Sequence, residues 1–123
     1  SYGASCIFPL LVPGNGYLMK EESQTVKREE VLLRAKDCVC GDREQDYGSP
    51  ERNFETIAGL WNAYLGDRLA EPVQPHDVAA MLALLKIARI SSGHVKADNW
   101  VDLAGYAACG GEIEIEKEEK RNA

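Results

Sequence analysis

Apolar side chains recur at the three- and four-residue spacing of an amphipathic helix in four parts of the chain. The four predicted helices cover residues 25–38, 50–65, 77–90 and 98–109. The alternation typical of a β-strand occurs only in the short, charged stretch 112–116, which is expected to be a frayed tail or a very short strand. The pattern therefore predicts an all-α protein built as a small four-helix bundle.

The predicted helices have recognisable start and stop signals. Ser49 and Pro50 suit the N-cap and the first helical position of the second helix. Gly41, Gly66 and the pair Gly110–Gly111 predict the ends of the first, second and fourth helices. The third helix is apolar nearly all round, so it is expected to be the buried centre of the domain.

The remaining residues divide the chain into three parts. Residues 1–18 contain prolines and glycines and no basic start, so we expect a leader outside the fold, either disordered or added upstream of a natural start at Met19. Residues 19–111 are expected to form a single domain. Residues 112–123 contain five glutamates and are expected to form a solvated acidic tail.

Charge and cysteine content narrow the class of protein. The chain has 20 acidic and 14 basic residues, a formal net charge of -6, which argues against a duplex nucleic acid as partner. No stretch approaches the ~18 apolar residues of a membrane span. The four cysteines form no C-x-x-C pair and have no histidine placed to complete a zinc site. Reduced thiols in a cytoplasmic protein are therefore expected.

Two cations interrupt the otherwise apolar third helix. Lys86 and Arg89 are three residues apart, so they share one face of the helix. Burying them without partners would cost several kcal/mol. Three arrangements avoid that cost: the long side chains extend to solvent at the helix end, they clamp a phosphate, or they pair with carboxylates of the next helix.

Two carboxylates share one face of the fourth helix. Asp98 and Asp102 are four residues apart, and Asn99 and Tyr106 lie beside them. Two aspartates at this spacing can hold a magnesium ion together with a substrate phosphate, although Asp98 is equally suited to capping the helix. The opposite face of this helix is expected to pack on the core through Trp100, Leu103, Ala104 and Ala107.

A third polar group precedes the second helix. Asp46-Tyr47-Gly48 can place an aromatic ring over a base and backbone groups near a phosphate, or it can be a plain turn with Tyr47 packed on the bundle. Asn53 and Glu55 lie within the helix that follows. Glutamates on a helix surface are common, so Glu55 alone indicates little.

Three sequence blocks together resemble a known family. They are DYGSPERNFETIAGLW (46–61), DVAAMLALLKIARI (77–90) and DNWVDLAGYAA (98–108). In this order, with their DYG, L-K-I-x-R and D-N-x-x-D-x-x-x-Y-A motifs, they are similar to small phage and prophage proteins of the MazG-like family. The resemblance covers about residues 40–111. It implies an all-α nucleotide pyrophosphohydrolase, which uses magnesium on helix-borne carboxylates to cleave a nucleoside or deoxynucleoside triphosphate to monophosphate and pyrophosphate.

The resemblance also implies a set of site residues. Magnesium would be held by Asp98 and Asp102, with Asp77 or Glu55 contributing from neighbouring helices. Lys86 would act in catalysis beside the two aspartates and neutralise charge on the phosphates. Substrate-binding residues would be Arg89, Asp46, Tyr47, Asn53, Asn99 and Tyr106.

The chain also departs from the family pattern. It lacks the E-E-x-x-E motif in its helical core, and Asn99-x-x-Asp102 stands where E-x-x-D is expected. Two alternatives to hydrolysis therefore stay open: a non-catalytic nucleotide-binding or host-modulating phage protein, and a purely structural ion-pair network. Four short helices make a shallow domain, so a homodimer or homotetramer with sites near the interface is expected, in the host cytoplasm if the protein is phage-encoded.

Overall fold

The computed structural model describes residues 26–41 and 49–123, and the regular secondary structure of this part of the chain is entirely helical. Its α-helices are α3 (Arg28–Cys40), α5 (Pro50–Leu65), α6 (Pro75–Ser91) and α7 (Ala97–Asn122), and the short 3₁₀ helix η2 (Gly66–Arg68) follows α5. The all-α prediction is confirmed for these residues. The predicted leader 1–18 and the turn residues Asp46 and Tyr47 lie outside the described residues.

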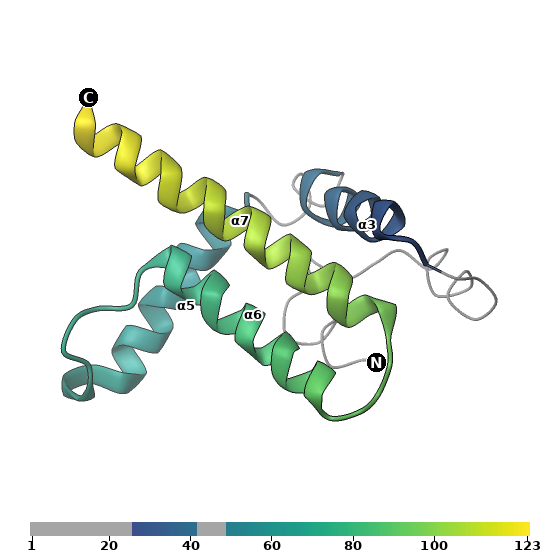
Figure 1. Cartoon of the computed structure of the whole chain (residues 1–123). Helices are drawn as coiled ribbons and strands as arrows, with labels where there is room; N and C mark the ends of the chain where they lie inside the picture. The colour runs from purple at the N-terminus through teal and green to yellow at the C-terminus, as the bar shows by residue number, and fades with distance from the viewer. Residues whose placement is uncertain (1–25, 42–48) are drawn as a thin grey trace.

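Helices α6 and α7 form the centre of the fold (Figure 1). Gly110 of α7 lies against Ala79 near the start of α6, and Asp102 lies against Lys86 farther along it. The residue numbers rise on one helix as they fall on the other, so the two helices run antiparallel. Helix α3 packs against α7, and α5 packs mainly against α6.

The start and end of α5 follow the sequence signals. Ser49 takes the N-cap position and its Oγ accepts a hydrogen bond from the backbone N–H of Arg52 at 3.2 Å, with Pro50 in the first turn. Gly66 ends the helix with a positive φ of 54°, a conformation that a side chain disfavours. Asn62 then fastens the connection to α6, because its amide exchanges hydrogen bonds with the backbone of Val73.

A small hydrophobic core lies where the four α-helices meet. Phe54 and Val78 are fully buried, and Val101 and Tyr106 are 1% exposed. The other members of the core are Ala35, Cys38, Ala58, Ala79, Leu82, Cys109 and Ile113. None of the helices in the described part of the chain is long and apolar enough to cross a membrane.

Helix α7 is longer than the sequence indicated. The predicted end at Gly110–Gly111 is wrong, and residues 112–122 continue the helix where a frayed acidic tail or short strand was expected. Gly110 marks a close helix contact instead, since a Cβ added there would lie 2.9 Å from the Cβ of Ala79. Ile113, beyond the glycines, is only 6% exposed, so the extension also contributes to the core.

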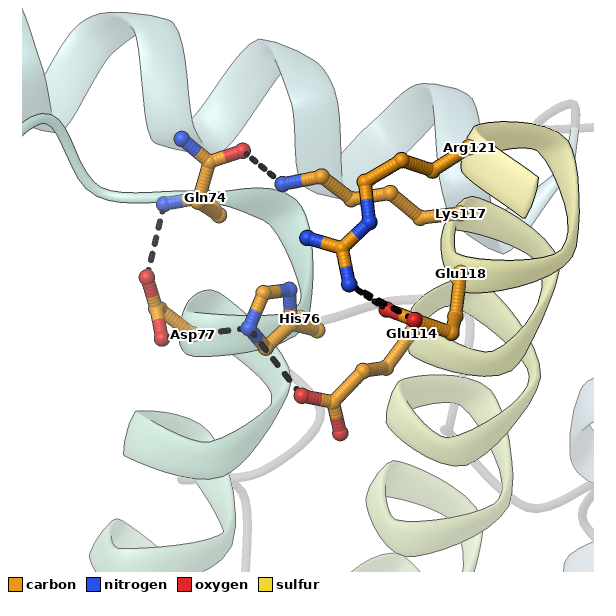
Figure 2. A network of polar contacts seen from close by, with 7 residues as sticks. All are labelled: Gln74, His76, Asp77, Glu114, Lys117, Glu118 and Arg121. Atoms are coloured by element: carbon orange, nitrogen blue, oxygen red, sulfur yellow. Dashed lines mark hydrogen bonds and ion pairs between the residues drawn. The ribbon is translucent and has the colours of Figure 1, made fainter.

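Polar contacts join the extension of α7 to the start of α6 (Figure 2). The Lys117 ammonium donates to Gln74 Oε1 at 3.0 Å. His76 Nε2 lies 3.6 Å from a carboxylate oxygen of Asp77 and 3.6 Å from one of Glu114. These side chains hold the two helices together beyond the point where Gly110 lets them approach.

Two neighbouring glycines provide a test of this contact. Gly111→Ala is expected to stabilise the protein by up to about 1 kcal/mol, because alanine favours the helix and nothing lies within 4 Å of the new methyl group. Gly110→Ala is expected to destabilise it by about 1–3 kcal/mol through the clash with Ala79. Urea unfolding measures both, and Gly110→Ala/Ala79→Gly should recover most of the loss. Equal effects at the two glycines would contradict this packing.

Candidate functional site

Helix α7 turns a partly charged face toward the rest of the protein. Asp98, Asn99 and Asp102 are buried on this face, together with apolar residues such as Val101. The prediction that the face of Trp100 packs on the core is wrong for Trp100 itself, whose side chain is 49% exposed, and holds only for Ala104, which packs against the core. Ala107 is also exposed, and Leu103 and Ala104 are only half-buried. The buried charges of α7 have a partner on α6, which explains this orientation.

That partner is Lys86. Its Nζ lies 2.9 Å from Oδ2 of Asp102, and neither side chain is exposed at all. The sequence alternative in which the cations of the third helix pair with carboxylates of the fourth is therefore correct for Lys86. Removing two charges from water costs several kcal/mol per ion, which their attraction offsets only in part. The pair is thus a costly feature at the centre of the α6–α7 interface.

The electrostatics of Asp102 reflect this enclosure. Burial raises the pKa of Asp102 from 3.8 to about 6, while the neighbouring Lys86 ammonium limits the rise. The charge of Asp98 raises the pKa further, and that of Arg89 lowers it. Asp102 is therefore ionised at neutral pH, but far closer to taking up a proton than an aspartate in water.

Four of the predicted site residues surround this pair. Asp98, on the preceding turn of α7, and Arg89, on the following turn of α6, both act electrostatically on Asp102. Tyr106 is buried on the next turn of α7, where burial and the charge of Asp102 raise the pKa of its hydroxyl. Arg89 is only half-buried, so it is the cation of the cluster that solvent reaches. Asn99 is buried next to Asp98.

The carboxylates have unused hydrogen-bonding capacity. Oδ1 of Asp98 and Oδ1 of Asp102 are buried, and none of residues 26–41 and 49–123 donates a hydrogen bond to either atom. A buried carboxylate oxygen without a donor is costly and needs a cation, a donor or a proton. These two oxygens could therefore accept a further hydrogen bond or contact a cation.

Magnesium could bind such a pair of carboxylates only if other groups complete its coordination. Within the described residues, no group of three or more His, Cys, Asp or Glu side chains is arranged to hold a metal. Magnesium commonly uses one or two carboxylates and takes its remaining ligands from water and phosphate oxygens. Asp98 and Asp102 could meet that requirement only with a phosphate-bearing substrate present.

Three other predicted site residues lie apart from the cluster. Asp77 accepts a hydrogen bond from the backbone N–H of Gln74 at 2.9 Å and caps the start of α6, about 13 Å along the helix from Lys86. Glu55 is exposed on α5. Asn53 donates a hydrogen bond to the Ser49 carbonyl at 3.3 Å in the first turn of α5.

Some buried polar residues were missed by the sequence analysis. Arg34 of α3 is 3% exposed, and its Nε donates to Glu30 Oε2 at 3.1 Å. The i,i+4 spacing of this pair was the available signal, but such pairs are usually solvated. Burial raises the pKa of the Cys109 thiol to about 12, which makes it unreactive. Cys38 and Cys109 are buried, and Cys40 is exposed.

The sequence model of a family described as a domain of unknown function, DUF6378, matches residues 30–114. This chain belongs to that family. The matched region holds every residue of the Lys86–Asp102 cluster.

Relatives of this DUF6378 chain occur in mycobacteriophages. The Gene 55 protein of Mycobacterium phage L5 is 39% identical over 90 residues, which are 73% of this chain and 56% of the relative. The Gene 55 protein of Mycobacterium phage D29 is 37% identical over 81 residues, 66% and 51% of the two chains. The chain thus spans about half the length of the curated relatives it matches. No solved structure matches it.

Removal of Lys86 tests the ion pair. Lys86→Met is expected to lower the free energy of unfolding at pH 7 by about 3 kcal/mol, because it leaves the Asp102 carboxylate buried without its cation. The loss should be smaller at pH 5, where the carboxyl group can take up a proton. Urea unfolding gives both values. The double variant Lys86→Met/Asp102→Leu should recover most of the loss, and a single variant as stable as the wild type would contradict the assignment.

The raised pKa of Asp102 predicts a pH dependence. The folded protein binds this proton more tightly than the unfolded chain, so the contribution of Asp102 to stability is full below about pH 3.8 and is lost as the pH rises through about 6. Asparagine mimics the protonated carboxyl group and does not titrate. Asp102→Asn loses its ion pair with Lys86 at every pH, but its stability relative to the wild type should rise as the pH increases from 4 to 7, because only the wild type loses the proton. Unfolding free energies of both proteins measure this difference, and a constant difference would refute the shift.

Proposed function

We propose that this domain binds a nucleoside or deoxynucleoside triphosphate and hydrolyses it, with magnesium, to a monophosphate and pyrophosphate. One observation carries the proposal: two cations and two carboxylates from α6 and α7 converge in one cluster, with carboxylate oxygens that lack donors among the described residues. The resemblance to MazG-like phage proteins supports the same chemistry. The two relatives are phage proteins as well, in agreement with the phage origin of the MazG-like proteins that the chain resembles.

The residues would divide the work by their exposure. Asp98 and Asp102 would hold magnesium, which when bound supplies positive charge to the phosphates and makes a bound water more acidic. Lys86, fully buried, orients the Asp102 carboxylate and balances its charge. Arg89, one turn along and half-buried, can reach a phosphate from the solvent side.

The rest of the substrate would meet polar side chains outside the Lys86–Asp102 pair. Asn99 and Tyr106 lie on the same helix as the two aspartates and border the cluster. From the family resemblance, Asn53, Asp46 and Tyr47 would approach the base or ribose. Asp77 caps the start of α6, so only Asp98 and Asp102 would hold the metal.

A second candidate function is nucleotide binding without turnover, as in a host-modulating phage protein. The 2.9 Å contact with Lys86 favours it, because it engages one of the two carboxylates that a metal would need. The missing E-E-x-x-E motif acts in the same direction. In either case we propose action in the host cytoplasm and association into a homodimer or homotetramer, which the large apolar side chains on the surface support.

Pyrophosphate release tests the enzymatic proposal. The protein is incubated with magnesium and each canonical NTP and dNTP in turn, and we expect release from at least one of them. Arg89→Gln should lower kcat/KM at least about tenfold, because a charged hydrogen bond to the phosphate is lost. Lys120→Gln, which removes an exposed cation near the end of α7, should leave the rate unchanged. Absence of release from every nucleotide would reject hydrolysis.

Thermal unfolding separates the two candidates. A nucleotide that binds the folded state and not the unfolded chain raises Tm, and the rise grows with the ratio of its concentration to its Kd. Stabilisation without magnesium and without pyrophosphate release would favour the binding protein, whereas stabilisation that requires magnesium favours the enzyme. Arg89→Gln should reduce the Tm shift in both cases. If no nucleotide shifts Tm, the cluster is a structural ion-pair network.

A further inference from the structure

The outward face of α6 is apolar along most of the helix. Between Val78 and Ser91 the only charged residues are Lys86, which is buried, and Arg89, which is half-buried. Leu84 is 66% exposed at the middle of this face. Five residues between Val78 and Ser91 have exposed side chains, and we call them the α6 stripe: Ala80, Met81, Leu84, Ile87 and Ala88. A contiguous apolar stripe of this kind marks an interaction surface.

The α6 stripe is nearly symmetrical about Leu84. Ala80 and Ala88 lie four residues before and after it, and Met81 and Ile87 lie three residues before and after it. If two copies of α6 pack antiparallel with Leu84 at the centre, Ala80 of one copy meets Ala88 of the other. Met81 then meets Ile87. Each apolar side chain then faces one of similar size on the other copy. The contacts are the same from either copy, as a two-fold interface requires.

The charge of the chain restricts the surface through which two copies can meet. Two copies with a formal net charge of -6 repel each other over most of their surface. The α6 stripe carries no charge, so two copies can meet there without bringing like charges together. A charged peptide or nucleic acid would find no opposite charge on it.

We propose that the α6 stripe binds the same stripe of a second copy of this chain in an antiparallel, two-fold dimer. The α6 stripe would be the interface of the homo-oligomer proposed above. It does not depend on the nucleotide chemistry, because Lys86 lies on the inward face of the same helix.

Leu84 and Leu60 form a matched pair for the first test. Both side chains are 66% exposed, but Leu60 lies on α5, outside the stripe. Sedimentation or light scattering of the full chain at increasing concentration should show a dimer. Leu84→Glu should weaken it by at least about tenfold, because two like charges would meet at the two-fold axis. Leu60→Glu should leave the dimer unchanged, and circular dichroism checks that both variants are folded.

Charge exchange then tests the antiparallel register. Ala80→Glu and Ala88→Lys should each weaken the dimer, whereas the two substitutions in one chain should restore it, since the new carboxylate of one copy faces the new ammonium of the other. Within one helix these positions are about 12 Å apart, too far to pair. If Leu84→Glu fails to fold, restoration of the dimer in Ala80→Glu/Ala88→Lys still tests the interface.

Three results would overturn the proposal: a monomeric wild type, a dimer that resists folded Leu84→Glu, or no rescue in the double variant. A dimer that dissociates with Leu60→Glu instead would assign the interface to α5 and reject the stripe. Nucleotide-induced Tm shifts measured on the same variants keep the two proposals separate. A loss of the dimer with an unchanged Tm shift leaves the nucleotide proposal intact, and a dimer without any Tm shift leaves the stripe intact.

Discussion

The ion pair between Lys86 and Asp102 is the interaction around which the two central helices are arranged. Both side chains are fully buried, so the orientations of α6 and α7 that bring them together are strongly constrained. Either charge alone in that position would cost several kcal/mol. Rotating α7 by about a third of a turn would expose Asp102, but it would leave Lys86 enclosed without a partner. The packing of Val101 and Tyr106 beside the pair follows from this orientation.

The sequence predicted the helices well because their local signals are strong. The cap at Ser49, the positive-φ end at Gly66 and the periodicity of α5 are all local features, and each appears in the structure. The end of α7 was predicted wrongly because a glycine pair has two meanings: it can stop a helix, or it can let another helix approach. Only the position of Ala79 in space decides that Gly110 has the second meaning.

The sequence predicted which charged residues of α6 and α7 lie together, but not which face of α7 points inward. Spacing alone placed Lys86 with Arg89, and Asp98 with Asp102, on single helix faces, and the structure brings these residues into one cluster. Which face of α7 points inward could not be read from the sequence, because the usual rule buries the apolar face of Trp100. That rule fails where two opposite charges on neighbouring helices neutralise each other inside the protein. The burial of Arg34 on α3 escaped prediction for a different reason, because its i,i+4 pair with Glu30 has the spacing of an ordinary solvated surface pair.

The burial of charge in α6 and α7 has a consequence for their outer faces. Each helix buries charged side chains among its apolar ones and leaves a large apolar side chain exposed, Leu84 on α6 and Trp100 on α7. A helix hairpin of this kind gains less from apolar burial than an ordinary amphipathic pair, since about 25 cal/mol per Å² of exposed apolar surface is not realised. Association of two copies through α6 would bury part of that surface and offset the cost of the enclosed ion pair. The charge cluster on the inner face and the apolar stripe on the outer face are therefore linked energetically, although each can be tested alone.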